Sequence, residues 1–562
     1  MSNRRWRQGA ACSLVLAFSL VPTAVVKADE GKGRSARVRE AARDKGHTRM
    51  DLLVRFRQVP GASERALMHD LGGRERRKMT ASSRWLSFRL PAHRVEALAE
   101  HHLVDYVGID EPISTTMDVA REAANEPVAP AVESALKGAG VTIAVVDSGV
   151  ALHPDIQTLT AVVDVVAHST PHAAPPEESI DPNGHGTHVA GIMVGTGRHS
   201  AGRMAGVAPE ANLVSVRVLD HVGRGLSSDL LAGLQWILAH KSEYGIRVVN
   251  MSLGHPVFEP AAMDPLVEAV DALWDAGLVV VCSAGNRGRN GYVTITSPCN
   301  SRKVITIGAT NDNHTPAITD DKIATYSSRG PTAFDLVAKP DLIAPGNRIV
   351  SLRSAGSHMD MLLPDRRVAA DPAAPLVEEY FEMSGTSMAS PIVAATAALM
   401  IQQDPSLNPG TVKARLMSSA VKPAFGSPLV SGAGYLDILG ALRATGTVTN
   451  APSPRSLVDA VTGTISFENT SVLWGSEAFS LRALWATSIS WADPSAYLEP
   501  FLQTTGTVWP AGMTEAQTEL WPNSELWPES ELWPDSPAWS PALTEETGPV
   551  LTEALSAGFQ DP

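Results

Sequence analysis

Between residues 136 and 445, short β-branched apolar runs alternate with stretches of helical periodicity, and this alternation limits the possible fold more than any other feature of the sequence. Five of the runs are apolar on both faces, as buried parallel strands are. They are 141–146, 213–218, 248–253, 278–282 and 304–307. Between them, 228–241 and 265–276 are predicted to be crossover helices. The Ala-rich stretch 388–402 is apolar on nearly every side, which predicts a central buried helix. We therefore expect an α/β domain with a mostly parallel sheet and helices on both faces.

The first 28 residues have the pattern of an export signal. Three arginines precede an apolar run over 10–21, and small residues follow it. This order is typical of a secretory signal peptide over 1–28, because the apolar run is too short to cross a bilayer comfortably. A core helix is the alternative. No other apolar run reaches about 18 residues, so we expect a protein secreted to the exterior or the cell surface, without a membrane span.

A smaller unit is predicted ahead of the α/β domain. The basic, polar stretch 29–49 has no apolar periodicity and is predicted to be a linker. Over 50–113, strand and helix patterns follow in the order β-α-β-α-β, which indicates a small α+β domain. The Ala- and Pro-rich stretch 114–135 is expected to be an exposed hinge.

The acidity of the chain is concentrated in its last part. The formal net charge is −14, which argues against binding of nucleic acid through net positive charge. Residues 446–562 contain 15 acidic and two basic residues, together with eight of the 12 tryptophans. Within this acidic, Trp- and Pro-rich tail a hexad repeats over 519–536, and its prolines exclude a continuous helix. Binding and disorder are both open for the tail.

Two cysteines, Cys282 and Cys299, remain once the predicted signal peptide is removed. In an oxidising compartment two such thiols can pair as a disulfide. Two buried apolar thiols are the alternative, and the sequence alone does not supply the geometry that would decide between them.

Four residues at the ends of predicted elements carry candidate chemistry. Asp147 ends the first strand of the α/β domain, where ligand sites of parallel sheets gather. His185 opens a predicted helix, and Asn286 follows the fourth strand. Ser387 begins the central helix, whose free N–H groups and dipole favour a developing negative charge. Taken singly, each of them also fits a turn, a helix cap or a packed polar side chain.

Taken together, these segments resemble the subtilisin-like serine proteases, in the order Asp, His, Ser. The matching motifs are Asp147-Ser148-Gly149, His185-Gly186-Thr187-His188, Ser283-Ala284-Gly285-Asn286 and Ser384-Gly385-Thr386-Ser387, with further matches at 206–209 and 249–254. The resemblance covers 136–445 and implies a three-layer subtilisin-like domain. The unit at 50–113 resembles the inhibitor-type propeptide of the same family.

The resemblance implies an acyl-transfer mechanism with an acyl-enzyme intermediate. Ser387 would be the nucleophile, His185 the base that takes its proton, and Asp147 the group that orients the imidazole. Asn286 would stabilise the oxyanion. Six further residues match the edge strands that pair with an extended polypeptide substrate. They are Ser252, Leu253 and Gly254 on one side and Gly225, Leu226 and Ser227 on the other. No cofactor is required for this chemistry, and His188 is assigned none.

The resemblance also implies a zymogen whose own propeptide inhibits it and is cleaved between about 113 and 135. Many subtilisins carry a calcium loop after the His helix. Here the corresponding stretch 195–203 is basic and lacks carboxylates, which are the ligands that calcium prefers. We therefore expect no calcium at that loop and assign no metal site, while calcium elsewhere stays open. The rival interpretation is a surface-binding scaffold in which the tail is the functional part.

Overall fold

The computed structural model describes residues 38, 48–115, 136–168, 170–312, 318, 321–370, 379–422, 427–458 and 465–485. The predicted signal peptide, nearly all of the predicted linker and hinge, and the hexad repeat lie outside this range. Within it, no helix combines the length and the apolar character needed to cross a bilayer.

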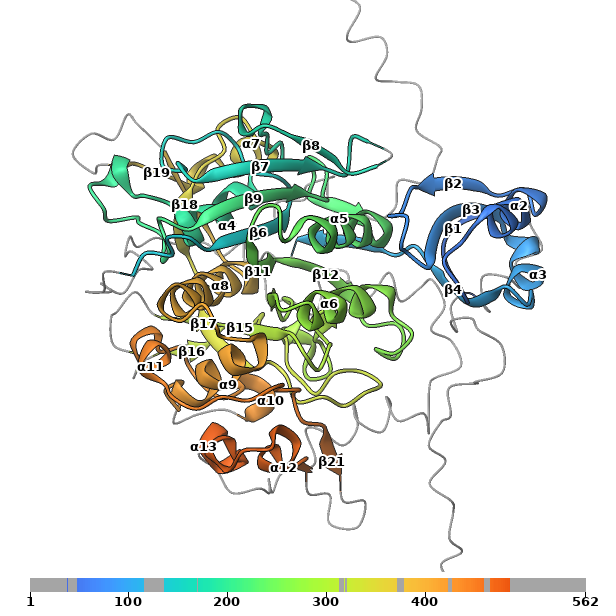
Figure 1. Cartoon of the computed structure of the whole chain (residues 1–562). Coiled ribbons are helices and arrows are strands. Elements are labelled where there is room, and N and C mark those ends of the chain that lie inside the picture. Colours follow the sequence, from blue (N-terminus) through green and yellow to red (C-terminus); the bar gives the residue numbers. More distant parts are fainter. Residues whose placement is uncertain are drawn as a thin grey trace, which may run out of the picture.

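A mostly parallel sheet forms the middle layer of the main domain (Figure 1). Nine of the described strands belong to it. In spatial order they are β16 (Lys322–Ile323), β15 (Ile305–Asn311), β13 (Val279–Ser283), β11 (Ile246–Met251), β6 (Thr142–Asp147), β9 (Asn212–Arg217), β7 (Leu159–Asp164) and β8 (His172–Ala174), with β17 (Leu342–Pro345) also paired to β15. Only the β15–β16 and β7–β8 pairings are antiparallel. The predicted α/β fold is confirmed, and four strands are additions to the five predicted ones: β7, β8, β16 and β17.

Helices cover both faces of this sheet. Helices α4 (His185–Val194) and α8 (Thr386–Gln403) pack against each other, as do α5 (Ser227–His240) and α6 (Pro265–Asp275) (Figure 1). Every residue of α8 from 386 to 401 is buried, as its uniformly apolar sequence predicts. Three shorter helices follow it along the chain. They are α9 (Pro409–Ser419), α10 (Pro428–Ser431) and α11 (Ile438–Arg443).

The small unit that precedes the main domain is a four-stranded antiparallel sheet with two helices. Its elements are β1 (Arg49–Phe56), α2 (Ala62–Asp70), β2 (Arg74–Arg77), β3 (Trp85–Pro91), α3 (Val95–Ala99) and β4 (Val104–Ile109). The predicted order lacked β2, because its sequence Arg-Glu-Arg-Arg has no apolar alternation and the strand forms only as the edge partner of β3.

Packed structure continues past residue 445. Strands β21 (Ser456–Val458) and β22 (Ile465–Phe467) form a hairpin, and helices α12 (Thr470–Trp474) and α13 (Leu481–Trp485) follow. Trp474, Phe479 and Leu484 are buried in the same apolar core as the main domain. The described residues between 446 and 485 are therefore packed onto the main domain.

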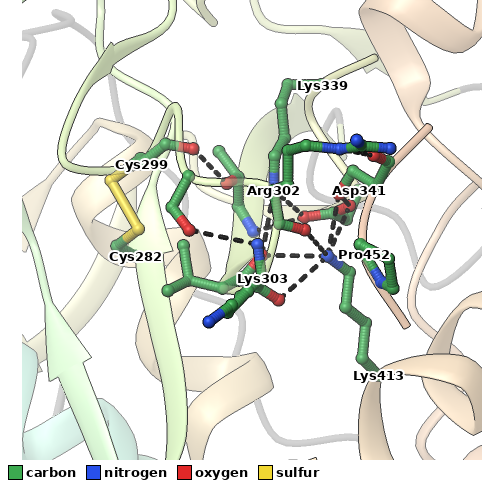
Figure 2. Close-up of polar contacts among 12 residues, drawn as sticks. Cys282, Cys299, Arg302, Lys303, Lys339, Asp341, Lys413 and Pro452 are labelled. Carbon is green, nitrogen blue, oxygen red and sulfur yellow. Dashed lines mark hydrogen bonds and ion pairs between the residues drawn. A yellow bond between two sulfur atoms is a disulfide. The ribbon is translucent and has the colours of Figure 1, made fainter. Parts of the chain in front are cut away.

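A buried ionic cluster holds this C-terminal segment to the main domain (Figure 2). The Lys413 Nζ donates to the carbonyl oxygens of residues 302–304 at 3.0–3.1 Å and to Ser453 Oγ at 2.8 Å. The Ser453 hydroxyl donates to Asp341 at 2.5 Å, and Lys339 donates to the other Asp341 oxygen at 2.6 Å. All three ionic side chains are at most 1% exposed, so the cluster is isolated from water.

Cys282 of β13 and Cys299 lie next to this cluster and are joined as a disulfide, with Cα atoms 5.9 Å apart (Figure 2). Both cysteines are fully buried. The Cys299 carbonyl accepts a hydrogen bond at 2.7 Å from Thr306 Oγ1 of β15, which fixes the backbone at Cys299 to that strand.

Candidate active site

Asp147 and His185 meet at the carboxyl end of the central sheet. Asp147 is the last residue of β6 and His185 the first of α4, and the His185 Nδ1 lies 2.7 Å from Asp147 Oδ1. Both side chains are at most 1% exposed. The His185 Nε2 has no hydrogen-bond partner among the described residues. With Nδ1–H donating to the carboxylate, Nε2 is the nitrogen left to accept a proton.

The turn ahead of His185 is held by Asp181, a buried carboxylate to which the sequence analysis gave no role. One Asp181 oxygen accepts from the Gly184 N–H at 2.8 Å and the Ser148 hydroxyl at 2.9 Å. The other accepts from the N–H and hydroxyl of Thr187 at 2.8 and 2.6 Å. Burial raises the pKa of Asp181 above its ordinary value. The N-cap of α4 is Gly184, and Asp181 accepts from the first turn of the helix from four residues before His185, so the usual N-cap pattern does not identify it.

Ser387 lies in the first turn of α8, beside the end of β11. Its hydroxyl donates to the Ser252 carbonyl at 3.0 Å, and the Ser252 hydroxyl donates to the Ser387 carbonyl at 2.9 Å. The Ser252 side chain is fully buried and holds the start of α8 through this hydrogen bond. Its backbone leads directly into the strand that begins at Leu253.

Asn286 follows β13, and its amide is held in one orientation. The side-chain oxygen accepts from the N–H of Thr386 at 3.0 Å and from its hydroxyl at 2.9 Å. The Nδ2 is buried without a hydrogen-bond partner in the part of the chain that the structure describes. A buried donor without a partner is costly, so its position beside the residue that precedes Ser387 indicates a group arranged to donate to a bound oxygen.

A strand that spans the predicted boundary between the small unit and the hinge occupies the space between two edge strands of the main domain, and we call this space the groove. Strand β5 (Pro112–Thr115) pairs antiparallel with both β10 (Arg224–Leu226) and β12 (Leu253–Pro256). Short polar segments of this kind carry no strand pattern, and β5 is extended because two edge strands pair with it.

The residues assigned to substrate binding line this groove in part. Gly225 is paired with Ile113, Gly254 with Ser114, and Leu253 with Thr115. Leu226 pairs with Pro112 in the same ladder. Ser227 and Ser252 are the exceptions. Ser227 is the first residue of α5, and its N–H and hydroxyl donate to the Glu111 carbonyl at 2.8 and 3.0 Å.

A buried and a half-buried carboxyl group lie where the small unit meets α5 and α6. Asp110 is 4% exposed and accepts from the Ser228 N–H at 2.8 Å. Burial raises the pKa of Asp110 to about 6, and the charge of Asp229 adds to the effect. Burial also raises the pKa of Glu259, which accepts from the Tyr106 hydroxyl, to about 8.

The loop at 195–203 was expected to hold no calcium. The carboxylate that faces it, Asp155, accepts hydrogen bonds from Tyr380 Oη at 2.6 Å, Thr196 Oγ1 at 3.2 Å and the His199 N–H at 3.2 Å. Among the described residues, no group of three or more His, Cys, Asp or Glu side chains is arranged to hold a metal ion.

His188 is buried inside the main domain. Its Nε2 lies 3.0 Å from the Ile349 carbonyl oxygen and 2.9 Å from the Phe381 carbonyl oxygen, and burial lowers its pKa to about 3.

Comparison with known proteins identifies the family of the chain. Residues 138–450 match the subtilase family. The chain is 40% identical over 346 residues to the serine protease AprX of Bacillus subtilis, an alignment that covers 60% of this chain and 74% of AprX. It is 29% identical over 408 residues to subtilisin E of the same species, covering 72% of this chain and 93% of subtilisin E. The crystal structure of fervidolysin from Fervidobacterium pennivorans is similar in fold, with a TM-score of 0.55 at 20% identity. That alignment covers 72% of this chain and 62% of the fervidolysin chain, which is less than two thirds of it.

Proposed function

The chain belongs to the subtilase family and is a serine-type endopeptidase, and from that premise we propose that Asp147, His185 and Ser387 form its catalytic triad. The observation that carries the proposal is the 2.7 Å contact between His185 Nδ1 and Asp147, together with a buried Nε2 that has no hydrogen-bond partner among the residues that the structure describes. A serine hydroxyl is a poor nucleophile unless a base removes its proton, and a neutral imidazole is suited to that task near pH 7.

The reaction begins with rotation of the Ser387 hydroxyl from the Ser252 carbonyl toward His185 Nε2. Nε2 takes the proton as Oγ attacks the peptide carbonyl, and the same proton then passes to the leaving amine. In the second half of the reaction, His185 Nε2 takes a proton from a water molecule that attacks the acyl-enzyme, and this proton then returns to the Ser387 oxygen. Asp147 stabilises the imidazolium that forms in both steps, at the 2.7 Å contact.

The oxyanion of each tetrahedral intermediate would accept from Asn286 Nδ2 and from the backbone at the start of α8. The two Thr386 hydrogen bonds on the Asn286 oxygen support this role, because they fix the amide before substrate arrives. The dipole of the 18-residue helix α8 adds to the stabilisation of the negative charge.

We also propose that the enzyme is secreted as a zymogen, with residues 50–113 as its inhibitor and an extended polypeptide as its substrate. The pairing of β5 with β10 and β12 supports both ideas, since an extended substrate would add a strand in the same place. Secretion rests on the sequence pattern of residues 1–28.

Active-site labelling tests the proposal. A peptidyl phosphonate should label the activated enzyme at Ser387, as located by peptide mass spectrometry. Ser387→Ala should abolish both labelling and peptide hydrolysis, and it should leave the chain uncut between 113 and 135 if maturation is autocatalytic. A label on another residue, or residual hydrolysis by the Ser387→Ala chain, would refute the triad.

A further inference from the structure

Asp181 is a buried carboxylate whose hydrogen bonds all come from neutral groups. It is 5% exposed and lies four residues before the candidate catalytic histidine. Besides the donors of Ser148, Gly184 and Thr187 described above, it accepts from the Asn183 N–H at 3.2 Å. Its two oxygens thus accept five hydrogen bonds. A buried polar network satisfied this completely is rigid, so the carboxylate can fix the groups that donate to it.

The Ser148 hydroxyl links Asp181 to the candidate triad. It donates to Asp181 at 2.9 Å and accepts from the Gly186 N–H at 3.0 Å. The Ser148 N–H donates at 2.8 Å to Asp147 Oδ1, the oxygen that also lies 2.7 Å from His185 Nδ1. Ser148 therefore holds the carboxylate of the triad through its backbone, and the residue after the histidine through its side chain.

The backbone segments around this link are packed without room for side chains. A Cβ atom on Gly149 would lie 2.1 Å from the Ile180 carbonyl oxygen. A Cβ atom on Gly186 would lie 2.0 Å from the Gly149 carbonyl oxygen and 3.2 Å from Asp147 Cβ. The segments that carry the two carboxylates and the histidine are thus in direct contact, so a displacement of one is passed to the others.

Both oxygens of Asp181 are needed to hold these segments together. One oxygen accepts from Ser148, and the other accepts from the Thr187 hydroxyl, which in turn accepts from the Ala151 N–H at 2.8 Å. An asparagine at position 181 would have a single acceptor oxygen and could not serve both Ser148 and Thr187.

We propose that Asp181 is a positioning residue for the protease reaction, and that it acts through the Ser148 hydroxyl to fix the Asp147 carboxylate against His185 Nδ1. This inference rests on the proposed triad and adds to it a group that touches neither the substrate nor the reacting atoms. The rate depends on this geometry because the carboxylate sets the tautomer and orientation of the imidazole.

The test measures kcat and KM for a peptide anilide with variants of the full chain. Each variant is matured by tagged wild-type enzyme, which is then removed by its tag. Ser148→Ala is the primary variant, because it leaves the Asp181 hydrogen bonds to Gly184 and Thr187 in place. It should lower kcat about 10–100-fold with KM unchanged, and Asp181→Asn should have a comparable effect. Because Asp181 acts through Ser148, the double variant should be no slower than the slower single variant.

Asp155→Asn is the matched control. Asp155 is also fully buried, and it accepts the hydrogen bonds of Thr196 and His199 beyond the C-terminal end of α4. The ten residues of α4 place that end about 15 Å from the histidine at its start. The control should lower the Tm, measured in the Ser387→Ala background, and leave kcat unchanged.

Four results would each overturn the proposal. They are an unchanged kcat in Ser148→Ala, a loss that appears in KM alone, a double variant whose loss is the product of the two single losses, and an equal loss of kcat in Asp155→Asn. Labelling of the wild-type enzyme separates these results from failure of the triad. If a peptidyl phosphonate does not label wild-type Ser387, the triad itself has failed.

Discussion

Raising the pH should weaken the hold of the small unit on the main domain, and Asp110 is the group whose contribution can be worked out. Its carboxylate accepts from the Ser228 N–H at 2.8 Å and from Ser87 Oγ at 3.3 Å, with Asp229 and Arg76 as the nearest charges. Once the units separate, α5 no longer covers Asp110, and its pKa should return toward 3.8 from about 6.

The sign follows from proton binding. Because the docked form has the higher pKa, it binds more protons than the separated form, so docking is strongest below about pH 4 and weakens as the pH rises through 6. Between pH 5 and 7 this group alone should weaken docking about ten-fold. The pKa of Glu259 is also raised in the docked form, from 4.5 to about 8, so ionisation of this group weakens docking as the pH rises as well. The total loss of docking affinity should therefore exceed the part due to Asp110.

The assay uses the Ser387→Ala chain, cut in the hinge by a trace of active enzyme to give an inert noncovalent complex. The dissociation constant is then measured by calorimetry at pH 5, 6 and 7. Asp110→Asn keeps an oxygen that can accept from Ser228 but cannot titrate, so the change in affinity from pH 5 to 7 should be about ten-fold smaller. Asp105→Asn is the control, since Asp105 is one-third exposed and pairs with Arg55 at 2.8 Å.

Two results would refute the reasoning. One is an affinity that stays constant or increases from pH 5 to 7 in the unsubstituted complex. The other is an Asp110→Asn complex whose pH dependence equals that of the unsubstituted one. A shift of the Asp105→Asn complex as large as that of Asp110→Asn would assign the effect to general charge and not to burial.

Three further predictions concern the main domain. Asn286→Ala should lower kcat by about 10²–10³-fold with little change in KM, because its amide would act on the oxyanion; steady-state hydrolysis of a peptide anilide measures this, and a change in KM alone would contradict it. Lys413→Met leaves Asp341 with one fewer cation and the carbonyls of Arg302 and Lys303 without the Lys413 donor, while Lys339 still donates to the Val304 carbonyl, so in the Ser387→Ala background it should cost about 3–5 kcal/mol in denaturant unfolding; an unchanged midpoint would show that Lys339 suffices. A chelator should leave the Tm of the mature enzyme unchanged if the loop at 195–203 holds no calcium, and a large drop would count against that expectation.

The positions of the candidate catalytic groups follow from local pattern. Asp147 ends a β-branched run, and Ser387 begins an apolar helix, so each could be placed at the end of an element from a few neighbouring residues. Since parallel strands bring their carboxyl ends to one edge of the sheet, the topology then gathers these ends in one region. Local pattern could not supply the orientation of the Asn286 amide, because it depends on Thr386, a hundred residues away in sequence.

Contacts between distant segments account for what sequence reasoning missed. Lys413 and Asp341 are charged residues that would ordinarily be placed at the surface, yet they are buried because Ser453 and backbone carbonyls satisfy them. The strongly acidic composition of 446–562 gave no sign that the first part of this segment packs against the main domain. Residues such as Trp474 and Phe479 there have no regular period, and only packing against the main domain shows that they belong to its core.

Contacts outside the groove would distinguish the small unit, as the proposed inhibitor, from a substrate. Both would pair with β10 and β12, so strand pairing alone gives the small unit no advantage over any extended polypeptide. Its advantage must come from contacts outside the groove. They include the hydrogen bonds that the Glu111 and Asp110 oxygens accept at the start of α5, the ion pair of Arg55 with Glu268 at 2.9 Å on α6, and the ion pair of Arg77 with Asp229 on α5. A substrate that follows only the groove makes none of them. It follows that substitutions at the start of α5 should alter inhibition far more than hydrolysis, whereas substitutions in β12 should alter both together.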